Sequence, residues 1–502
     1  MNMKAFYLQE KYFKAFCGLF IFSMLYIFPI ILANFYYVDD LLRSMSGDTY
    51  WEINGRPLAS FLTIAINGGM PLMDVSPWIY ILSVAILSYS LILFLKKYVP
   101  RATSFQLVCI ASCSYFNFFL LENLSYKYDS LGMICSLSLF LILYALPESL
   151  NRKKHLALSA VAVLMSLSLY QASIGAYLAL SILEYIFLFL QNASCKSIIK
   201  RLLLRFLGLL TGGILYKLLV VQIYIQTAGY SVEHSQMVNP LSTLGIQRIS
   251  FNIAAFSDLF RVYVESLGHL GTLSLAILIL GISCMIYHNW QNRRETVFVK
   301  MVISLMFLIS PLLLLVASVI PLVLLNIPVF ASRVLLSFTI FTLFIGIAIY
   351  HLGEVKKCFL AFAVIIMVYS LSFSSCYGNL LNRQESMNTM VAVSLVRDIN
   401  DLEVESKKKI NALSIIGISP RCHEFSLTRK KKPLFDWLVP IYMNNNWSWG
   451  GQYLSHYRKN PVQLRRDDSD EAYVKANIPL RQNEFYNLYL QDDKVIVLFL
   501  PE

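Results

Sequence analysis

The sequence is poor in charged residues and lacks the familiar motifs of soluble nucleotide and hydrolase chemistry. Only 14% of its 502 residues are charged, against 57% that are hydrophobic, whereas soluble domains run near one quarter charged. There is no Walker A loop, no G-x-G-x-x-G after a strand, no H-E-x-x-H and no G-x-S-x-G. This composition excludes an ordinary aqueous globular protein, and soluble nucleotide chemistry has no visible site.

The nine cysteines show no metal-ligand spacing. Cys109 and Cys113 lie one helical turn apart in an apolar run, which is typical of packing residues. Only Cys376 and Cys422 fall in the polar tail, and they could form a disulfide if the tail lies in an oxidising compartment. We therefore predict no metal site and no cofactor; a divalent ion on external carboxylates is an alternative that no spacing requires.

Long apolar runs recur from Phe16 to Ser374, and most approach the ~20 residues that a helix needs to cross a bilayer. The first run follows Lys4, Lys11 and Lys14 as in a signal peptide. It is longer than a usual signal and has no clean A-x-A site, so we interpret it as an uncleaved span. The pattern predicts an all-α polytopic membrane protein. The eleven predicted spans cover about 16–33, 78–95, 105–121, 129–146, 156–170, 172–190, 205–223, 268–287, 299–325, 334–350 and 357–374.

Basic residues alternate between the connections of these spans. One set of short connections holds eighteen Lys and Arg residues, and the opposite set holds seven over longer stretches. The positive-inside rule then predicts a cytoplasmic N-terminus, with the tail on the outside. The same bias explains the net charge of +12 without a nucleic-acid partner.

Two domains follow from this topology. Residues 1–374 form the membrane domain, with a long first external loop at 34–77. This loop contains GRPLASFLTIAINGGM, an apolar stretch too short to span, which predicts a re-entrant or interfacial helix. Residues 375–502 contain the strand-like runs LSIIGIS and KVIVLFL and an aromatic, turn-rich piece, which predict a small mixed α/β external domain.

Asp39 and Asp40, with Arg43 behind them, follow directly on the first apolar run. They could simply cap the helix of LLRSM. Alternatively, a carboxylate at membrane depth, with Arg43 keeping its partner ionised, can take a proton from an acceptor hydroxyl. We predict that Asp39 and Asp40 are catalytic and that Arg43 contacts the substrate, without assigning the base to either acid.

Further candidates lie at the external ends of other spans. Glu122, Lys127 and Asp129 bracket a charged turn and are either interfacial anchors or cavity-facing groups. Arg56 and Arg333 could join Lys127 in clamping a lipid-linked phosphate, because a guanidinium offers phosphate a bidentate fork.

Two more pairs complete the predicted substrate-binding set. Tyr170 and Gln171 form a very short turn, and their side chains could either pack inside the protein or contact the substrate. Trp447 and Trp449 could stack on sugar rings, or could anchor the tail in the membrane interface.

In order along the chain, YYVDDLLRS, NGRPLASFL, ENLSYKYDSLGM, SLYQASIGAYL and ASRVLL resemble the O-antigen-modifying, serotype-converting bacterial glucosyltransferases, the type II glucosyl transferase group. The resemblance runs from about residue 30 to 380. It implies a GT-C membrane glycosyltransferase with catalytic acids in the first external loop, which falls on Asp39 and Asp40. It also implies an undecaprenyl-phosphate-linked sugar donor, a lipopolysaccharide O-antigen acceptor, and a partner flippase and donor synthase. The membrane is then the bacterial inner membrane, and the external loop at 34–77 and the domain at 375–502 lie in the periplasm.

Two other functions compete with this interpretation. A transporter or flippase of polyprenyl-linked sugar would place polar residues along a transbilayer path, whereas charge is concentrated at the external ends of the spans, with Glu184 and Lys217 as exceptions. Another envelope enzyme, such as an O-antigen polymerase or a phosphoethanolamine transferase, is the second rival. The phosphoethanolamine transferase would be expected to carry a soluble domain with metal-ligand carboxylates and histidines, and the tail does not arrange its own in that way. The sequence leaves open the sugar, the linkage and the anomeric outcome.

Overall fold

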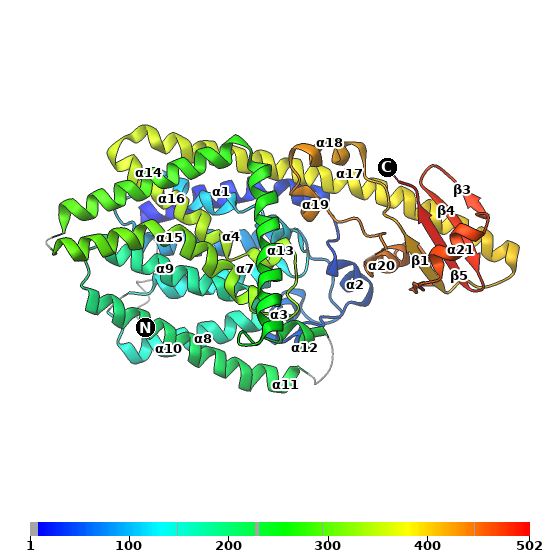
Figure 1. Ribbon diagram of the computed structural model, residues 1–502, viewed down its shortest axis with the longest axis horizontal. Coiled ribbons are helices and arrows are strands. Elements are labelled where there is room, and N and C mark those ends of the chain that lie inside the picture. Colours follow the sequence, from blue (N-terminus) through cyan, green and yellow to red (C-terminus); the bar gives the residue numbers. More distant parts are fainter. Residues whose placement is uncertain (1–8, 148, 226–229, 294, 446, 502) are drawn as a thin grey trace. The chain divides into compact units, whose positions relative to one another are not determined.

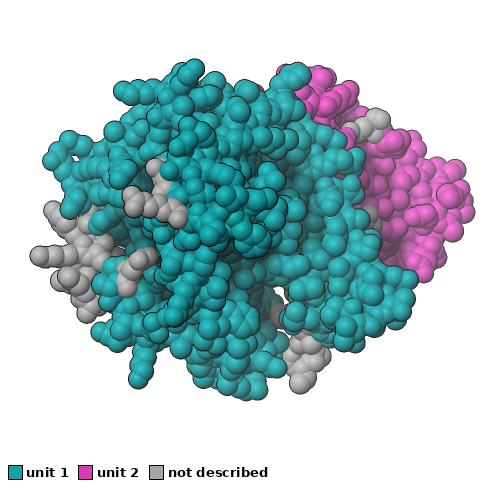
Figure 2. Space-filling view, turned by 60° about the vertical axis from the view of Figure 1, so that its left-hand side comes forward, with its two compact units in different colours: residues 1–28, 48–375 teal, residues 29–47, 376–502 magenta. Residues whose placement is uncertain are grey.

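A computed structural model of the protein describes residues 9–501 except 148, 226–229, 294 and 446 (Figure 1). The chain divides into two compact units, coloured separately in Figure 2. Unit 1 comprises residues 1–28 and 48–375, and unit 2 comprises residues 29–47 and 376–502. The segment that bears Asp39 and Asp40 therefore belongs to the same unit as the tail.

Unit 1 is helical. The long helices that begin in it are α1 (Glu10–Ala33), α4 (Trp78–Tyr98), α8 (Arg152–Leu169), α9 (Ile174–Leu190), α10 (Cys195–Tyr216), α13 (Thr243–Leu267), α14 (His269–Asn292), α15 (Val297–Val323), α16 (Phe338–Val355) and α17 (Leu360–Ser406). The shorter ones are α3 (Pro57–Asn67), α5 (Ser104–Ser112), α6 (Leu120–Ser125), α7 (Ser130–Ala145), α11 (Gln222–Tyr224) and α12 (Tyr230–Ser235). The helix predicted within residues 55–70 is α3.

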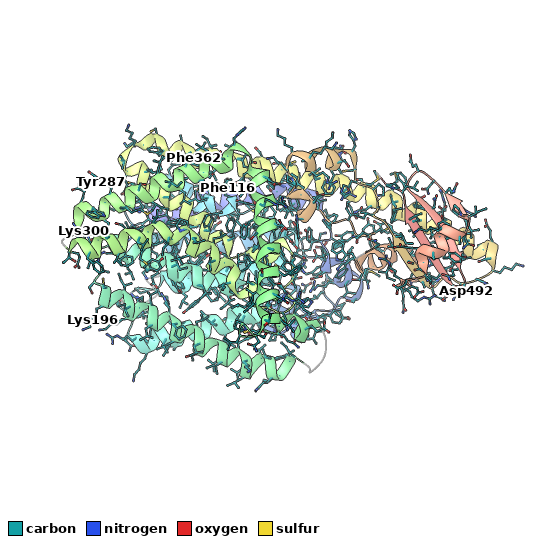
Figure 3. The ribbon with its side chains drawn as sticks, in the orientation of Figure 1. Phe116, Lys196, Tyr287, Lys300, Phe362 and Asp492 are labelled. Carbon is teal, nitrogen blue, oxygen red and sulfur yellow. The ribbon has the colours of Figure 1, made fainter. Side chains whose placement is uncertain are left out.

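Eight helices of the described chain are long and apolar enough to cross a membrane. They are Glu10–Ala33, Trp78–Tyr98, Gln171–Leu190, Cys195–Tyr224, His269–Gln291, Val297–Val323, Phe338–Val355 and Lys357–Ser406. The predicted spans at 105–121, 129–146 and 156–170 fall in helices that are shorter or less apolar, so the count of eleven stays a prediction. Lys196 and Lys300, from two of the Lys- and Arg-rich connections, lie at the same end of unit 1 (Figure 3).

Helix α17 is far longer than its predicted span. Its 47 residues extend for about 70 Å, more than twice the ~30 Å of a bilayer's hydrocarbon. The apolar half, residues 360–381, is long enough to cross, and the first charged side chain after it is Arg383. We therefore treat only residues 360–381 as membrane-spanning.

Unit 2 contains the mixed α/β fold predicted for the tail. Its five strands are β1 (Ala412–Ile416), β2 (Gln463–Leu464), β3 (Arg481–Gln482), β4 (Tyr486–Gln491) and β5 (Lys494–Phe499), in the order β2-β1-β5-β4-β3. Strand β1 is parallel to β2 and β5, whereas β4 is antiparallel to β3 and β5. The helices are α2 (Asp39–Ser46), α18 (His423–Lys431), α19 (Phe435–Leu438), α20 (Trp449–Ser455) and α21 (Asp470–Ala476).

The sheet core of unit 2 is built by the predicted strand-like runs. Leu413 and Ile415 of β1 and Val495 and Val497 of β5 are buried. The β4–β5 hairpin turns at Asp492, which has a φ of 55°; aspartate tolerates this left-handed region better than most residues. The predicted strands in LSIIGIS and KVIVLFL are thus confirmed as β1 and β5.

Candidate functional site

The two adjacent acids of α2 have different surroundings. Asp40 is fully buried, and its Oδ2 accepts a hydrogen bond from the backbone N–H of Tyr37 at 3.1 Å. The Asp39 side chain is 36% exposed and lies 3.9 Å from Nη1 of Arg43, whose side chain is only 7% exposed. One acid therefore stabilises the turn from inside, and the other reaches the surface beside a buried guanidinium.

The turn before these acids adopts an unusual backbone conformation. Val38, the residue before α2, has a φ of 46° and a ψ of −100°. A positive φ is an outlier for a β-branched residue, because its branched side chain crowds the backbone. Such strain persists only where the surroundings enforce it, and it is common at functional sites. This observation marks the Asp39–Asp40 turn as a candidate site.

The tail supplies the contacts that hold this turn. The Val38 N–H donates to the Tyr442 hydroxyl at 3.2 Å, and that hydroxyl donates to the Tyr36 carbonyl at 2.6 Å. The Tyr37 hydroxyl donates to the Leu438 carbonyl at 2.8 Å. These hydrogen bonds join residues 36–38 to residues of the tail about 400 positions further along the chain. The tail is therefore part of what positions the acids.

Aromatic rings reinforce the same junction. Tyr442 stacks between Phe35 and Tyr453, with ring centroids 5.7 Å and 5.0 Å away, and Trp447 stacks on it at 5.7 Å. Trp447 therefore already packs on a protein ring, although it is only half-buried. Trp449, also half-buried, is the first residue of α20. The sugar-stacking role predicted for these two tryptophans stays a prediction.

His456 joins α2 to the end of α20. Its Nε2 lies 3.1 Å from the Leu41 carbonyl, to which it donates. Burial lowers the pKa of His456, although the hydrogen bond to Leu41 opposes the shift. The imidazole is thus neutral at pH 7 and acts as a hydrogen-bond donor to the first turns of α2.

Glu385 is an acid of unit 2 that the sequence analysis did not select. Its Oε1 accepts from the Tyr453 hydroxyl at 3.0 Å, and Tyr453 also contacts Thr389 and Tyr457. Burial raises the pKa of Glu385 to about 7, although its hydrogen bonds to Tyr453 and Asn388 oppose the shift. The available signal was position: Glu385 is the first carboxylate after the last predicted span, which ends near residue 374.

The remaining predicted residues belong to unit 1, and several are paired with one another. Lys127, 2% exposed, donates to Asp74 at 2.7 Å. Burial would raise the pKa of Asp74, but the hydrogen bonds from Lys127 and Ser76 outweigh it and lower the pKa. The Arg333 backbone N–H donates to Glu122 at 2.8 Å, and its guanidinium lies 3.4 Å from the same carboxylate.

Arg56 and Gln171, which the sequence placed in two separate groups of candidates, are hydrogen-bonded to each other. The Arg56 Nε donates to the Gln171 Oε1 at 2.6 Å, and the guanidinium lies 4.9 Å from the Tyr170 ring centroid. Gln171 donates in turn to the Asn54 carbonyl at 2.7 Å. Gly55 is required here: it has a φ of 71°, and a Cβ would lie 2.6 Å from the Tyr216 hydroxyl.

These contacts sort the predicted cations. Lys127 and Arg333 each contact a carboxylate, so their charge is already partly balanced, whereas Arg56 donates to a neutral amide. Asp129 is buried immediately before α7. In the described part of the chain, no three His, Cys, Asp or Glu side chains form a group that could hold a metal ion, and Cys376 and Cys422 are free thiols.

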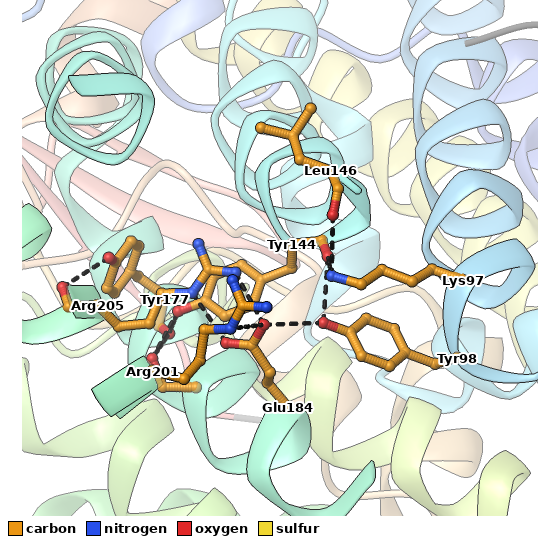
Figure 4. Close-up of polar contacts among 9 residues, drawn as sticks. Lys97, Tyr98, Tyr144, Leu146, Tyr177, Glu184, Arg201 and Arg205 are labelled. Atoms are coloured by element: carbon orange, nitrogen blue, oxygen red, sulfur yellow. Dashed lines mark hydrogen bonds and ion pairs between the residues drawn. The ribbon is translucent and has the colours of Figure 1, made fainter. Parts of the chain in front are cut away.

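Glu184, one of the two exceptions to the concentration of charge at the external span ends, is part of a buried ion pair. Arg205 donates to both of its carboxylate oxygens, at 2.8 Å and 2.9 Å, and Tyr98 donates to it at 3.1 Å (Figure 4). Both charged side chains are 2% exposed. Glu184 therefore joins α4, α9 and α10 and does not line an open path.

Comparison with known proteins gives two matches. The family described as "Glucosyl transferase GtrII" matches residues 28–350. A Salmonella phage P22 protein, described as "Uncharacterized 55.3 kDa protein in gtrB 5'region", is 26% identical over 435 residues, covering 85% of this chain and 86% of its own length. No solved structure matches.

Proposed function

Because the chain belongs to the glucosyl transferase GtrII family, we propose that it moves a glucosyl group from undecaprenyl-phosphate-linked sugar to a lipopolysaccharide O-antigen repeat. The reaction takes place at the periplasmic face of the inner membrane. Family membership supports the transferase activity, and the strained, tail-held turn at Val38–Asp40 is the observation that carries the site assignment.

In this reaction the acceptor hydroxyl oxygen attacks the anomeric carbon of the donor sugar. The bond from that carbon to the phosphate oxygen breaks, and undecaprenyl phosphate leaves with the electron pair. The hydroxyl proton passes to a carboxylate, for which we propose Asp39, because its side chain reaches the surface. Arg43, at 3.9 Å from Asp39, places a positive charge beside that carboxylate.

Asp40 has a different role in this proposal. Its carboxylate is fully buried and bonded to the Tyr37 N–H, so it fixes the turn that presents Asp39. We expect it to act as a positioning residue. The aromatic group around Tyr442 supports the same turn, and the exposed part of Trp447 is the surface that we propose for sugar stacking.

For unit 1 we propose a substrate-binding role centred on Arg56. The Arg56 guanidinium contacts the neutral amide of Gln171 and the ring of Tyr170. Lys127 and Arg333 each contact a carboxylate instead. The charge of Arg56 is therefore the least compensated of the three predicted cations. Gln171 and Tyr170 orient its guanidinium, whereas Lys127, Asp129, Glu122 and Arg333 build the surrounding polar group.

The rival function of a transporter predicts polar residues along a transbilayer path. Of the two exceptions to charge at the span ends, Glu184 and Lys217, the first is bonded to Arg205 and so does not support such a path. The predicted topology, with eleven spans, a cytoplasmic N-terminus and a periplasmic tail, is part of the proposal, as are a partner flippase and a donor synthase. A cysteine introduced at exposed Lys408 should be labelled from the periplasm in intact cells; labelling only after the inner membrane is breached would refute this topology.

Mass analysis of lipopolysaccharide, with and without the gene, tests the activity. A gain of one hexose per repeat is expected, and an unchanged mass would refute the transferase proposal. Asp39→Asn should abolish the gain while leaving membrane insertion and expression normal. Asp40→Asn should reduce it as well, with greater protease sensitivity of the tail. Full activity of both variants would refute the site assignment.

A further inference from the structure

A short part of unit 2 carries concentrated positive charge. Residues 421–438, called the basic segment here, comprise α18, α19 and the turn between them. The segment has five cations against two carboxylates, Glu424 and Asp436. The cations are Arg421, Arg429, Lys430, Lys431 and Lys432. Asp436 pairs with Arg429 at 2.8 Å, and Glu424 pairs with Arg383 of α17 at 3.7 Å.

One face of α18 is exposed along its whole length. His423, Leu427, Lys430 and Lys431 are all exposed, and their spacing of three and four residues places them on the same side of the helix. Leu427 is 55% exposed, and Trp437, in the following α19, is 40% exposed. Lysines combined with an exposed aliphatic residue and a tryptophan are typical of segments that lie in a membrane interface.

The attachment of the basic segment fixes its depth. Gln384 donates to the Pro420 carbonyl at 3.2 Å and accepts from the Cys422 N–H at 2.9 Å. The rings of Tyr377 and Phe435 stack in parallel, 6.5 Å apart. The segment is thus joined to α17 over residues 377–384, where the apolar half of that helix gives way to its charged half (Figure 1).

The end of the first apolar helix lies at the same level. A Cβ on Gly378 would lie 2.5 Å from Pro29, so α1 and α17 are in close contact there. Helix α1 ends four residues later, at Ala33. Helix α1 and the apolar half of α17 therefore both end where the basic segment is attached, which is the level of the lipid headgroups.

We propose that the basic segment lies on the membrane surface and binds the headgroups of anionic phospholipids. Polybasic segments next to a membrane helix are attracted to anionic leaflets, and the effect falls off within a Debye length of the surface. Because the Leu438 carbonyl accepts from the Tyr37 hydroxyl, this attachment also sets the height of the Asp39 turn above the bilayer. The inference does not depend on the proposed reaction.

Hydrogen exchange of the full-length protein in nanodiscs tests this directly. Amides of residues 423–438 should exchange more slowly in nanodiscs with about one third phosphatidylglycerol than in phosphatidylcholine alone. Lys430→Gln with Lys431→Gln should remove the difference, because each surface charge is worth about fivefold in attraction to an anionic leaflet. Both lysines are exposed, so the fold is expected to persist, and unchanged exchange of β1 and β5 verifies it.

The matched control is Lys407→Gln with Lys408→Gln. These lysines are equally exposed but follow the far end of α17, about 35 Å along the helix from Arg383, beyond the reach of the surface charge. The control should keep the full lipid effect. No slowing by phosphatidylglycerol, or an equal loss in both double variants, would overturn the proposal. Slowing in phosphatidylcholine only after undecaprenyl phosphate is added would also overturn it, since the segment would then bind the donor lipid.

Discussion

The buried carboxyl of Glu385 predicts a stability of unit 2 that decreases as pH rises. Its pKa is raised from 4.5 to about 7 by burial. Between these values the unfolded chain releases the proton while the folded chain retains it, so the free energy of unfolding falls with increasing pH. A shift of this size lowers the free energy of unfolding by on the order of 3 kcal/mol, and the decrease is complete above about pH 7.

Glu385→Gln removes this titration because the amide is neutral at every pH. The variant should equal the wild type near pH 4 and should be more stable by up to about 3 kcal/mol near pH 8. Its amide oxygen still accepts the hydrogen bond that Tyr453 donates to Glu385. Pulse proteolysis of the tail in urea, at several pH values between these limits, measures unit 2 separately from the rest of the chain.

Asp401→Asn provides the matched control, since Asp401 lies on the same helix with an exposed side chain. It should leave the pH profile of the wild type unchanged. A wild-type stability that is flat or rising over this pH range, or a Glu385→Gln variant with the wild-type slope, would refute the reasoning from burial.

Two further predictions concern the contacts that hold the fold. Tyr442→Phe removes the hydroxyl that joins the tail to residues 36–38 but keeps the stacked ring; it should cost about 1–3 kcal/mol in unit 2 and lower the transfer rate, and wild-type activity would show that this link is dispensable. Glu184→Gln leaves the buried guanidinium of Arg205 without its carboxylate; we expect a loss of about 3–5 kcal/mol, seen as a lower Tm in detergent. An unchanged Tm would contradict the buried-pair argument.

Sequence periodicity predicted the helical part of the fold where apolar runs are long. The runs near residues 16–33 and 299–325 became α1 and α15, because any such run must satisfy its backbone internally in lipid. The same reasoning was weaker for shorter runs, and residues 129–146 form only a 16-residue helix. Periodicity also predicted no helix between residues 226 and 266, because charged side chains interrupt the apolar pattern there. Helix α13, Thr243–Leu267, covers much of this stretch.

For the candidate site, the sequence determined which residues are chemically competent, and the tertiary structure decided how they are grouped. Asp39 and Asp40 are adjacent in the chain, but only the fold exposes one and buries the other. The sequence likewise placed residues 34–77 in the membrane domain, whereas the contacts of Tyr37 and Val38 join part of this loop to the tail. The physical reason is that hydropathy is a local property of the chain, while hydrogen bonds between residues 400 positions apart depend on how the chain folds.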